Sequence, residues 1–194
     1  MKKKTGAAYR IASPELPPPS HSYEFVLAGN GVFLRASQPK IAVQFPLAHC
    51  PIRGLVPLSP SFQMEVPRVP QLLVAELVEM ALRQIETEIL FYLNWEQNHW
   101  RLNIPNQTGG AAQVIPTEET GDSYRHALIE CHSHGRMKAF FSDQDDQDEQ
   151  GFRLYAVLGN LPHTPTFRTR VGVFGYFWEI CSTCVFELPP GVNP

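Results

Sequence analysis

The most informative segment of this chain is ALIECHSHGRMKAFFSDQDDQDE, residues 127–149. It contains the pattern H-x-H-x7-S-x2-D, whose named positions are His132, His134, Ser142 and Asp145. The apolar residues before this pattern predict a strand that begins near Tyr124 and enters a buried sheet. Alternate side chains of a strand share one face, so we expect the two histidines to point the same way. This arrangement suits two imidazoles that bind one metal ion.

A helix is expected to begin at Ser142, because Ser-x-x-Asp followed by further acids is typical of a capped helix N-terminus. Asp145 then falls in the first turn, where its carboxylate can reach a metal ion held by the strand. Two histidines and one carboxylate leave zinc an open position for water, which is the composition of a catalytic site. Each part alone has a plainer interpretation: a half-exposed His-x-His, a simple capping box, or a solvated acidic turn. The three parts together favour the metal site.

These residues resemble the JAMM motif of the JAB/MPN/Mov34 metalloprotease family. The run HSHGRMKAFFSDQDDQDEQGFRLY and the helical pattern upstream are similar to its prokaryotic JAB branch, and more narrowly to protein A of the PRTRC (ParB-related, ThiF-related) cassettes. The similar region spans about residues 70–188. The resemblance implies an α/β fold, a JAB/MPN (cytidine-deaminase-like) mixed β-sheet flanked by helices. One departure is Gly135, where family members usually carry proline.

The family motif also includes a glutamate upstream, where a helix passes into the first strand of the sheet. Residues 71–84 have the spacing of an amphipathic helix, and residues 85–93 are rich in β-forming side chains with two acids at their start. Glu88 matches the family position best, just inside the expected strand. Glu86 lies on the same strand face and remains the alternative.

The resemblance implies a zinc-dependent hydrolase, in which His132, His134 and Asp145 bind Zn²⁺. Glu88 is then the general base, and Ser142 donates a hydrogen bond to the developing oxyanion. The implied reaction is isopeptidase or peptidase cleavage at the C-terminal tail of a ubiquitin-like protein, by processing or deubiquitinase-like deconjugation. Activating (E1/ThiF-like) and conjugating (E2-like) cassette proteins are the implied partners.

Two other functions stay open at this point: a non-catalytic JAB-fold scaffold or interaction subunit of a plasmid or mobile-element cassette, and a DNA-associated module. Many JAB-fold subunits that act as scaffolds lack part of the ligand set, whereas this sequence retains it. A net charge of −3 and the absence of a basic stripe count against direct nucleic-acid binding.

Three parts are expected along the chain. Residues 1–20 are rich in lysine and proline and predict a mobile tail. Residues 21–69 predict a small β-rich appendage, with short strands near residues 23–27, 32–35 and 41–45. Residues 70–194 form the metalloprotease domain, in which residues 152–158 and 170–180 predict further strands.

Composition indicates a globular, soluble protein, since 43% of residues are hydrophobic and 18% are charged, and the few cysteines indicate a reducing cytoplasm. No apolar run has the length of a membrane span, and the start lacks the apolar segment of a secretion signal. Four cysteines are too few for a disulfide framework in this length. Cys131 alternates with the histidines and is expected in the core, away from the metal. Cys181 and Cys184 form a lone CxxC without the second pair of a zinc ribbon, so packed or half-exposed reduced thiols are expected.

Overall fold

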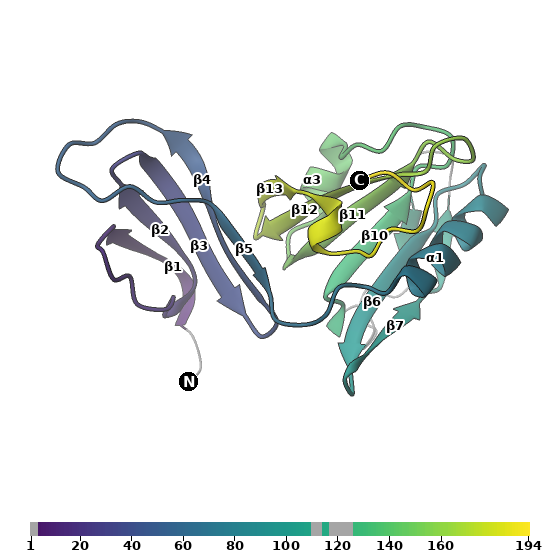
Figure 1. Ribbon diagram of the computed structural model, residues 1–194, viewed down its shortest axis with the longest axis horizontal. Coiled ribbons are helices and arrows are strands. Elements are labelled where there is room, and N and C mark those ends of the chain that lie inside the picture. Colours follow the sequence, from purple (N-terminus) through teal and green to yellow (C-terminus); the bar gives the residue numbers. More distant parts are fainter. Residues whose placement is uncertain (1–3, 110–113, 117–125) are drawn as a thin grey trace. The chain divides into compact units, whose positions relative to one another are not determined.

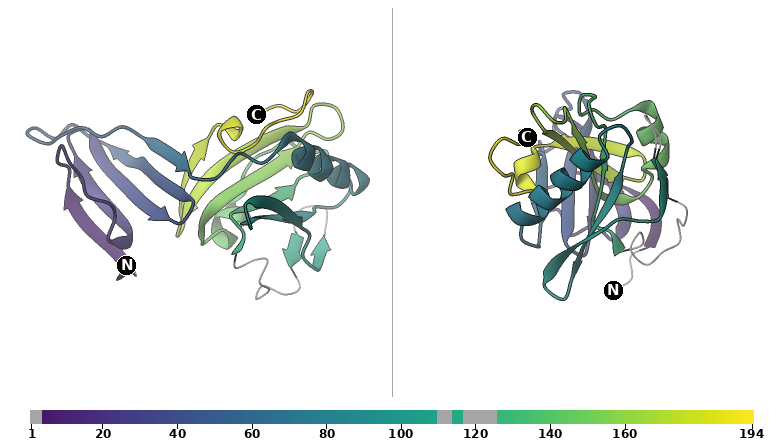
Figure 2. Two further views of the ribbon diagram at one scale, coloured as in Figure 1. Left: turned by 60° about the horizontal axis from the view of Figure 1, so that its bottom comes forward. Right: turned by 90° about the vertical axis from the view of Figure 1, so that its right-hand side faces the viewer.

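The computed structural model (Figures 1 and 2) describes residues 4–109, 114–116 and 126–194. The chain divides into two compact units, Met1–Val66 and Pro67–Pro194. Among the residues that the structure describes, none of the helices has the length and apolar character that a membrane span requires.

The N-terminal unit is built on a five-stranded sheet with the order β1-β2-β3-β4-β5. Its strands are β1 (Lys4–Ile11), β2 (His21–Ala28), β3 (Gly31–Gln38), β4 (Ile41–His49) and β5 (Ser61–Met64). β1 runs parallel to β2, and the other neighbours are antiparallel. The three strands predicted between residues 23 and 45 are confirmed as parts of β2, β3 and β4.

The prediction of a mobile tail over residues 1–20 is wrong for Lys4–Ile11, which form β1; residues 1–3 lie outside the described part. Two interactions stabilise this strand. Its backbone pairs with β2, and the Nε atom of Arg10 lies 2.9 Å from the Oε2 atom of Glu24, whose side chain is fully buried. The lysine and proline content of residues 1–20 does not reveal this pairing, because strand β2 and Glu24 lie outside that segment.

The C-terminal unit contains a mixed six-stranded sheet with the order β13-β12-β11-β10-β6-β7. Its strands are β6 (Leu90–Glu96), β7 (His99–Asn103), β10 (Ile129–Ser133), β11 (Phe152–Gly159), β12 (Thr166–Val173) and β13 (Tyr176–Ile180). Only the β10–β11 pair is parallel within this sheet. β8 (Gln107–Gly109) and β9 (Val114–Pro116) pair antiparallel in a separate two-stranded sheet. These mixed sheets with few helices fit the expected α/β class.

Helix α1 (Gln71–Arg83) confirms the predicted amphipathic helix and lies alongside this sheet (Figures 1 and 2). Its buried stripe consists of Val74, Leu77, Val78 and Ala81. Helix α3 (Asp143–Asp148) is a short helix that contributes no buried residue. A 3-10 turn, η1 (Ser182–Cys184), follows β13.

Two predicted strands have different limits in the structure. The chain turns after α1, with the backbone N–H of Thr87 donating to the carbonyl of Gln84, so β6 begins at Leu90 rather than near residue 85. The predicted strand 170–180 is interrupted at Phe174 and Gly175, whose φ angles of 50° and 85° form the turn between β12 and β13. The expected start of the motif strand near Tyr124 lies outside the described residues.

Candidate metal centre

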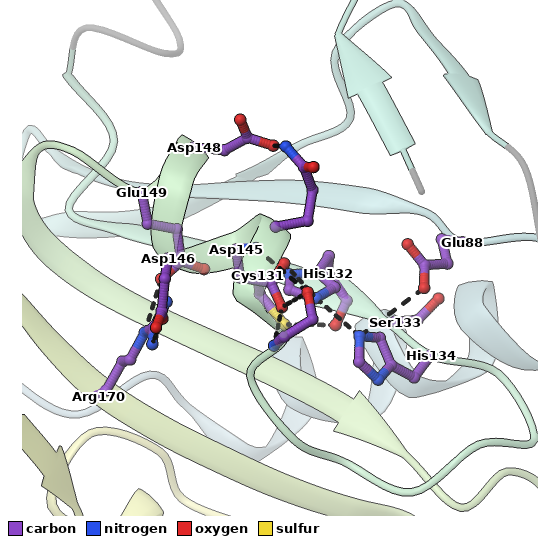
Figure 3. Close-up of polar contacts among 12 residues, drawn as sticks. Glu88, Cys131, His132, Ser133, His134, Asp145, Asp146, Asp148, Glu149 and Arg170 are labelled. Carbon is purple, nitrogen blue, oxygen red and sulfur yellow. Dashed lines mark hydrogen bonds and ion pairs between the residues drawn. The ribbon is translucent and has the colours of Figure 1, made fainter. Parts of the chain in front are cut away.

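The two motif histidines lie at the end of β10, in the middle of the six-stranded sheet. His132 pairs with Leu90 of β6 and Val157 of β11, and His134 is held one residue beyond the strand by a 2.7 Å hydrogen bond from its N–H to the carbonyl of Leu158. Both side chains are buried, and their Nε2 atoms are 3.1 Å apart (Figure 3). The prediction that they share one face is confirmed.

Asp145 reaches the histidines from the first turn of α3. The Ser142 backbone N–H and hydroxyl donate to Asp145 Oδ2 at 2.6 and 2.7 Å, and the Asp145 N–H donates back to Ser142 Oγ at 3.2 Å. This is the predicted capping box. It leaves Oδ1 directed towards His132, 3.4 Å from Nε2. One ligand atom from each of His132, His134 and Asp145 then lies within 4.8 Å of the other two.

The protonation of the imidazoles fits a metal-binding role. The Nδ1 atom of His134 lies 3.2 Å from the carbonyl oxygen of Lys138, which can only accept. Nδ1 therefore carries the hydrogen, and Nε2 keeps its lone pair towards His132. Burial lowers the pKa of His132 to about 4 and also lowers the pKa of His134. Both rings are thus neutral at pH 7, the form that binds a metal ion.

The structure brings Glu88, and not Glu86, to this cluster. Glu88 is 6% exposed, and its Oε1 atom is 3.7 Å from His134 Nε2. Burial, together with the charge of Asp145, raises the pKa of Glu88 to about 7. Glu86 is exposed and binds the guanidinium of Arg136 at 3.0 Å. Both acids precede β6, so the strand-face argument that paired them does not apply.

Ser142 lies at the site because it hydrogen-bonds Asp145. Its role as a hydrogen-bond donor to the oxyanion remains a prediction. Ser133, which the sequence analysis did not single out, stands between the two histidines in the sequence and is fully buried. Its hydroxyl oxygen accepts from the N–H of Ile89 at 3.2 Å, which fixes the residue after Glu88 against β10. Cys131 is fully buried, as predicted, and burial raises the pKa of its thiol.

Helix α3 is anchored by a residue that the sequence analysis missed, Arg170 of β12. Its guanidinium lies between the rings of Phe141 and Phe177, 4.0 and 3.7 Å from their centroids. It donates from Nε to Glu149 Oε2 at 2.7 Å and also bonds Asp146 (Figure 3). Because α3 buries nothing of its own, these contacts position the helix that carries Asp145. The available signal was Arg170 at the start of the apolar run RVGVF, in a segment otherwise expected as a buried strand.

The loop after the histidines explains why glycine stands where the family usually has proline. Gly135 has φ +53°, and a Cβ atom there would lie 2.2 Å from the carbonyl oxygen of Ile85. Proline is fixed near φ −65° and does not fit this turn. The loop is closed by backbone bonds from Leu161 to Gly135 and from Asn160 to Met137. Phe140 borders the site, with its ring edge-on to His134 at 4.8 Å.

The site joins two histidines at the end of β10 to an aspartate of α3, a group that could hold a metal ion, with a glutamate from the segment before β6 beside it. The comparison with known families agrees with this set of residues. A family model described as prokaryotic homologues of the JAB domain matches residues 70–171, more than half of the chain. The chain belongs to this family. Among curated proteins, no match to the chain was found.

Proposed function

We propose that this chain is a zinc-dependent JAMM-type metalloprotease, a hydrolase of peptide or isopeptide bonds, with the cytidine-deaminase-like arrangement of its family. The observation that carries the proposal is the convergence of His132, His134 and Asp145 within 4.8 Å, beside the buried carboxyl group of Glu88. All four cysteines are free, which suits a cytoplasmic setting.

The ligand set fits zinc, since neutral imidazole nitrogens and a carboxylate are its usual donors at three-ligand sites. When bound, zinc would supply an acidified water and polarise the scissile carbonyl. The chain's own residues then have separate tasks. Glu88, with its pKa near 7, accepts the proton of the attacking water and delivers it to the leaving amine. Ser142 holds Asp145 in place and is the proposed hydrogen-bond donor to the oxyanion.

The proposed substrate is the C-terminal tail of a ubiquitin-like protein or its conjugate. Such a tail is extended and can add as a strand to a sheet edge. E1/ThiF-like and E2-like proteins are the proposed partners in the same system. Support for the substrate comes from the family resemblance, and support for the reaction comes from the donor set.

Metal analysis of the purified protein tests the ligand set. We expect about one equivalent of zinc in the wild type and loss of zinc in His132→Ala, since two remaining donors hold the ion poorly. His99→Ala is the matched control, because His99 is exposed on the β6–β7 hairpin. Less than about half an equivalent in the wild type would favour the scaffold function.

The hydrolase assay uses a ubiquitin-like protein with a C-terminal peptide extension, followed by mass analysis of its tail. Glu88→Gln should retain zinc and lose cleavage, whereas Glu86→Gln should retain both. Cleavage that survives in Glu88→Gln contradicts the assigned general base. Zinc binding by the wild type without any cleavage of such substrates contradicts the proposed reaction.

A further inference from the structure

The CxxC pair near the end of the chain is exposed in the structure, contrary to the expectation of packed or half-exposed thiols. Cys181 precedes η1 and Cys184 ends it, in the short yellow helical turn of Figure 1. Both are exposed and free. They share no residue with the metal centre.

The backbone holds the two cysteines at a separation that a disulfide can bridge. The N–H of Cys184 donates to the carbonyl of Cys181 at 2.9 Å, closing a four-residue turn. The ends of such a turn have Cα atoms less than about 7 Å apart. Disulfides span Cα distances of about 4.4–6.8 Å. The Cα separation of such a turn is therefore compatible with a disulfide.

Buried neighbours fix this turn from beneath. Ser182, between the two cysteines, is 2% exposed, and its hydroxyl donates to the carbonyl of Phe167 at 3.1 Å and accepts from Thr169 Oγ1 at 2.9 Å. The N–H groups of Val185 and Phe186, both fully buried, donate to the carbonyl of Ser182. Ser182 thus points inwards while both thiols face solvent, which pre-organises the pair.

The two thiols have different surroundings. The Sγ atom of Cys181 lies 3.0 Å from the hydroxyl oxygen of Thr183, and it also accepts from the Thr183 N–H. Donors of this kind stabilise a thiolate and lower the pKa of Cys181. Cys181 is therefore suited to attack, and Cys184 to resolve the product.

We propose that Cys181 and Cys184 form a redox-active dithiol, which is oxidised reversibly to an intramolecular disulfide by exchange with a low-molecular-weight disulfide. The thiolate of Cys181 attacks one sulfur of that disulfide, its S–S bond breaks, and one small thiolate leaves. The Cys184 thiol then loses its proton to solvent and attacks Cys181 Sγ, which displaces the second small thiolate. The protein dithiol loses two electrons, and the small disulfide becomes two thiols.

The test equilibrates the reduced full-length protein with glutathione and glutathione disulfide at several ratios. Acid quenching, alkylation of free thiols and peptide mass analysis then follow. We expect the Cys181–Cys184 peptide to lose two hydrogens without gaining glutathione. Cys50, an exposed single thiol in the same chain, is the internal control and should gain one glutathione. If the Cys181–Cys184 peptide gains glutathione as Cys50 does, the proposal is wrong.

Single variants test the two roles. Cys184→Ser should accumulate a mixed disulfide at Cys181. By peptide mass analysis, Cys181 of this variant should react with iodoacetamide at pH 7 severalfold faster than Cys184 of Cys181→Ser. Thr183→Val should remove part of this advantage, and Thr183→Ser should restore it. Equal rates in the two cysteine variants contradict the assigned order. The same oxidation in His132→Ala shows that the dithiol acts independently of the metal ligands, and its loss there contradicts that independence.

Discussion

Replacing Arg170 by methionine removes the cation that ties α3 to strand β12. The side chains of Arg170 and Glu149 are each 5% exposed and lie 2.6 Å apart from Nη2 to Oε2. Methionine keeps apolar contact with Phe141 and Phe177 but offers no donor. Because α3 buries no residue, we expect the variant to lose both stability and the fixed orientation of Asp145.

The magnitude follows from burial. Removing one partner of a buried ion pair typically costs about 3–5 kcal/mol, because the other charge is left unpaired. Burial raises the pKa of Glu149, and the charge of Arg170 opposes this rise. Without Arg170 this opposition is lost, so the pKa of the carboxyl group rises further and the folded variant retains the proton instead of an unpaired charge. This places the loss near the lower limit, about 3 kcal/mol. The loss should grow as pH rises above about 4.5, because the unfolded chain releases the Glu149 proton there, whereas the folded variant retains it.

Arg168 of the same strand provides the control. It pairs with Glu179, but the two side chains are 49% and 53% exposed, and such surface pairs contribute about 0–1 kcal/mol. Chemical denaturation of metal-free Arg170→Met and Arg168→Met measures the difference. Chelator competition measures zinc affinity, which should fall about 10–100-fold in Arg170→Met only. Equal destabilisation in both variants, or unchanged zinc affinity in Arg170→Met, would refute the role of Arg170 as the anchor of α3.

Three further predictions concern the site itself. Ser142→Ala removes the N-cap of α3 and should lower the free energy of unfolding by about 0.5–2 kcal/mol in urea denaturation, with weaker zinc binding because Asp145 loses its hydroxyl partner. Gly135→Ala should destabilise by about 1–3 kcal/mol, since φ +53° is strained for alanine and its Cβ would meet the Ile85 carbonyl. Gly54→Ala, where φ is +85° but nothing lies within 4 Å, separates backbone strain from that clash. In metal-free protein the folded state retains a proton on Glu88 up to about pH 7, whereas the unfolded chain releases it near 4.5. The stability advantage of wild type over Glu88→Gln should therefore shrink as pH rises from 4.5 to 7, and an unchanged difference contradicts the raised pKa.

Local features of the site could be predicted from the sequence because their bonds join near neighbours. The capping box links Ser142 to Asp145, three positions apart, and the alternation of a strand places His132 and His134 on one face. Family resemblance supplied the link between these two elements. The sequence shows glycine at position 135, where the family usually has proline. The reason, the close approach of the Ile85 carbonyl, is visible only in the structure.

The features that were missed depend on partners distant in sequence. Arg170 binds Glu149 and Asp146 across 21 and 24 positions, so no short window contains the anchor. The sequence analysis preferred Glu88 but left Glu86 open, because the start of β6 depends on contacts such as the bond from Ile89 to Ser133, 44 positions away. Strand β1 likewise exists because β2 supplies its backbone partners.

The electrostatics of the cluster favour a divalent cation over protons at this point of the fold. Burial disfavours the second proton that would charge either imidazole, and the Lys138 carbonyl directs the lone pair of His134 Nε2 towards His132 Nε2, 3.1 Å away. Two carboxyl groups lie beside these nitrogens, Asp145 at 3.4 Å from His132 and Glu88 at 3.7 Å from His134, and the charge of the first raises the pKa of the second. A cation can satisfy both lone pairs and the Asp145 carboxylate without protonating either ring. The positive charge of the cation would also lower the pKa of Glu88 and favour its carboxylate form. The carboxylate is the form that accepts a proton in the proposed reaction.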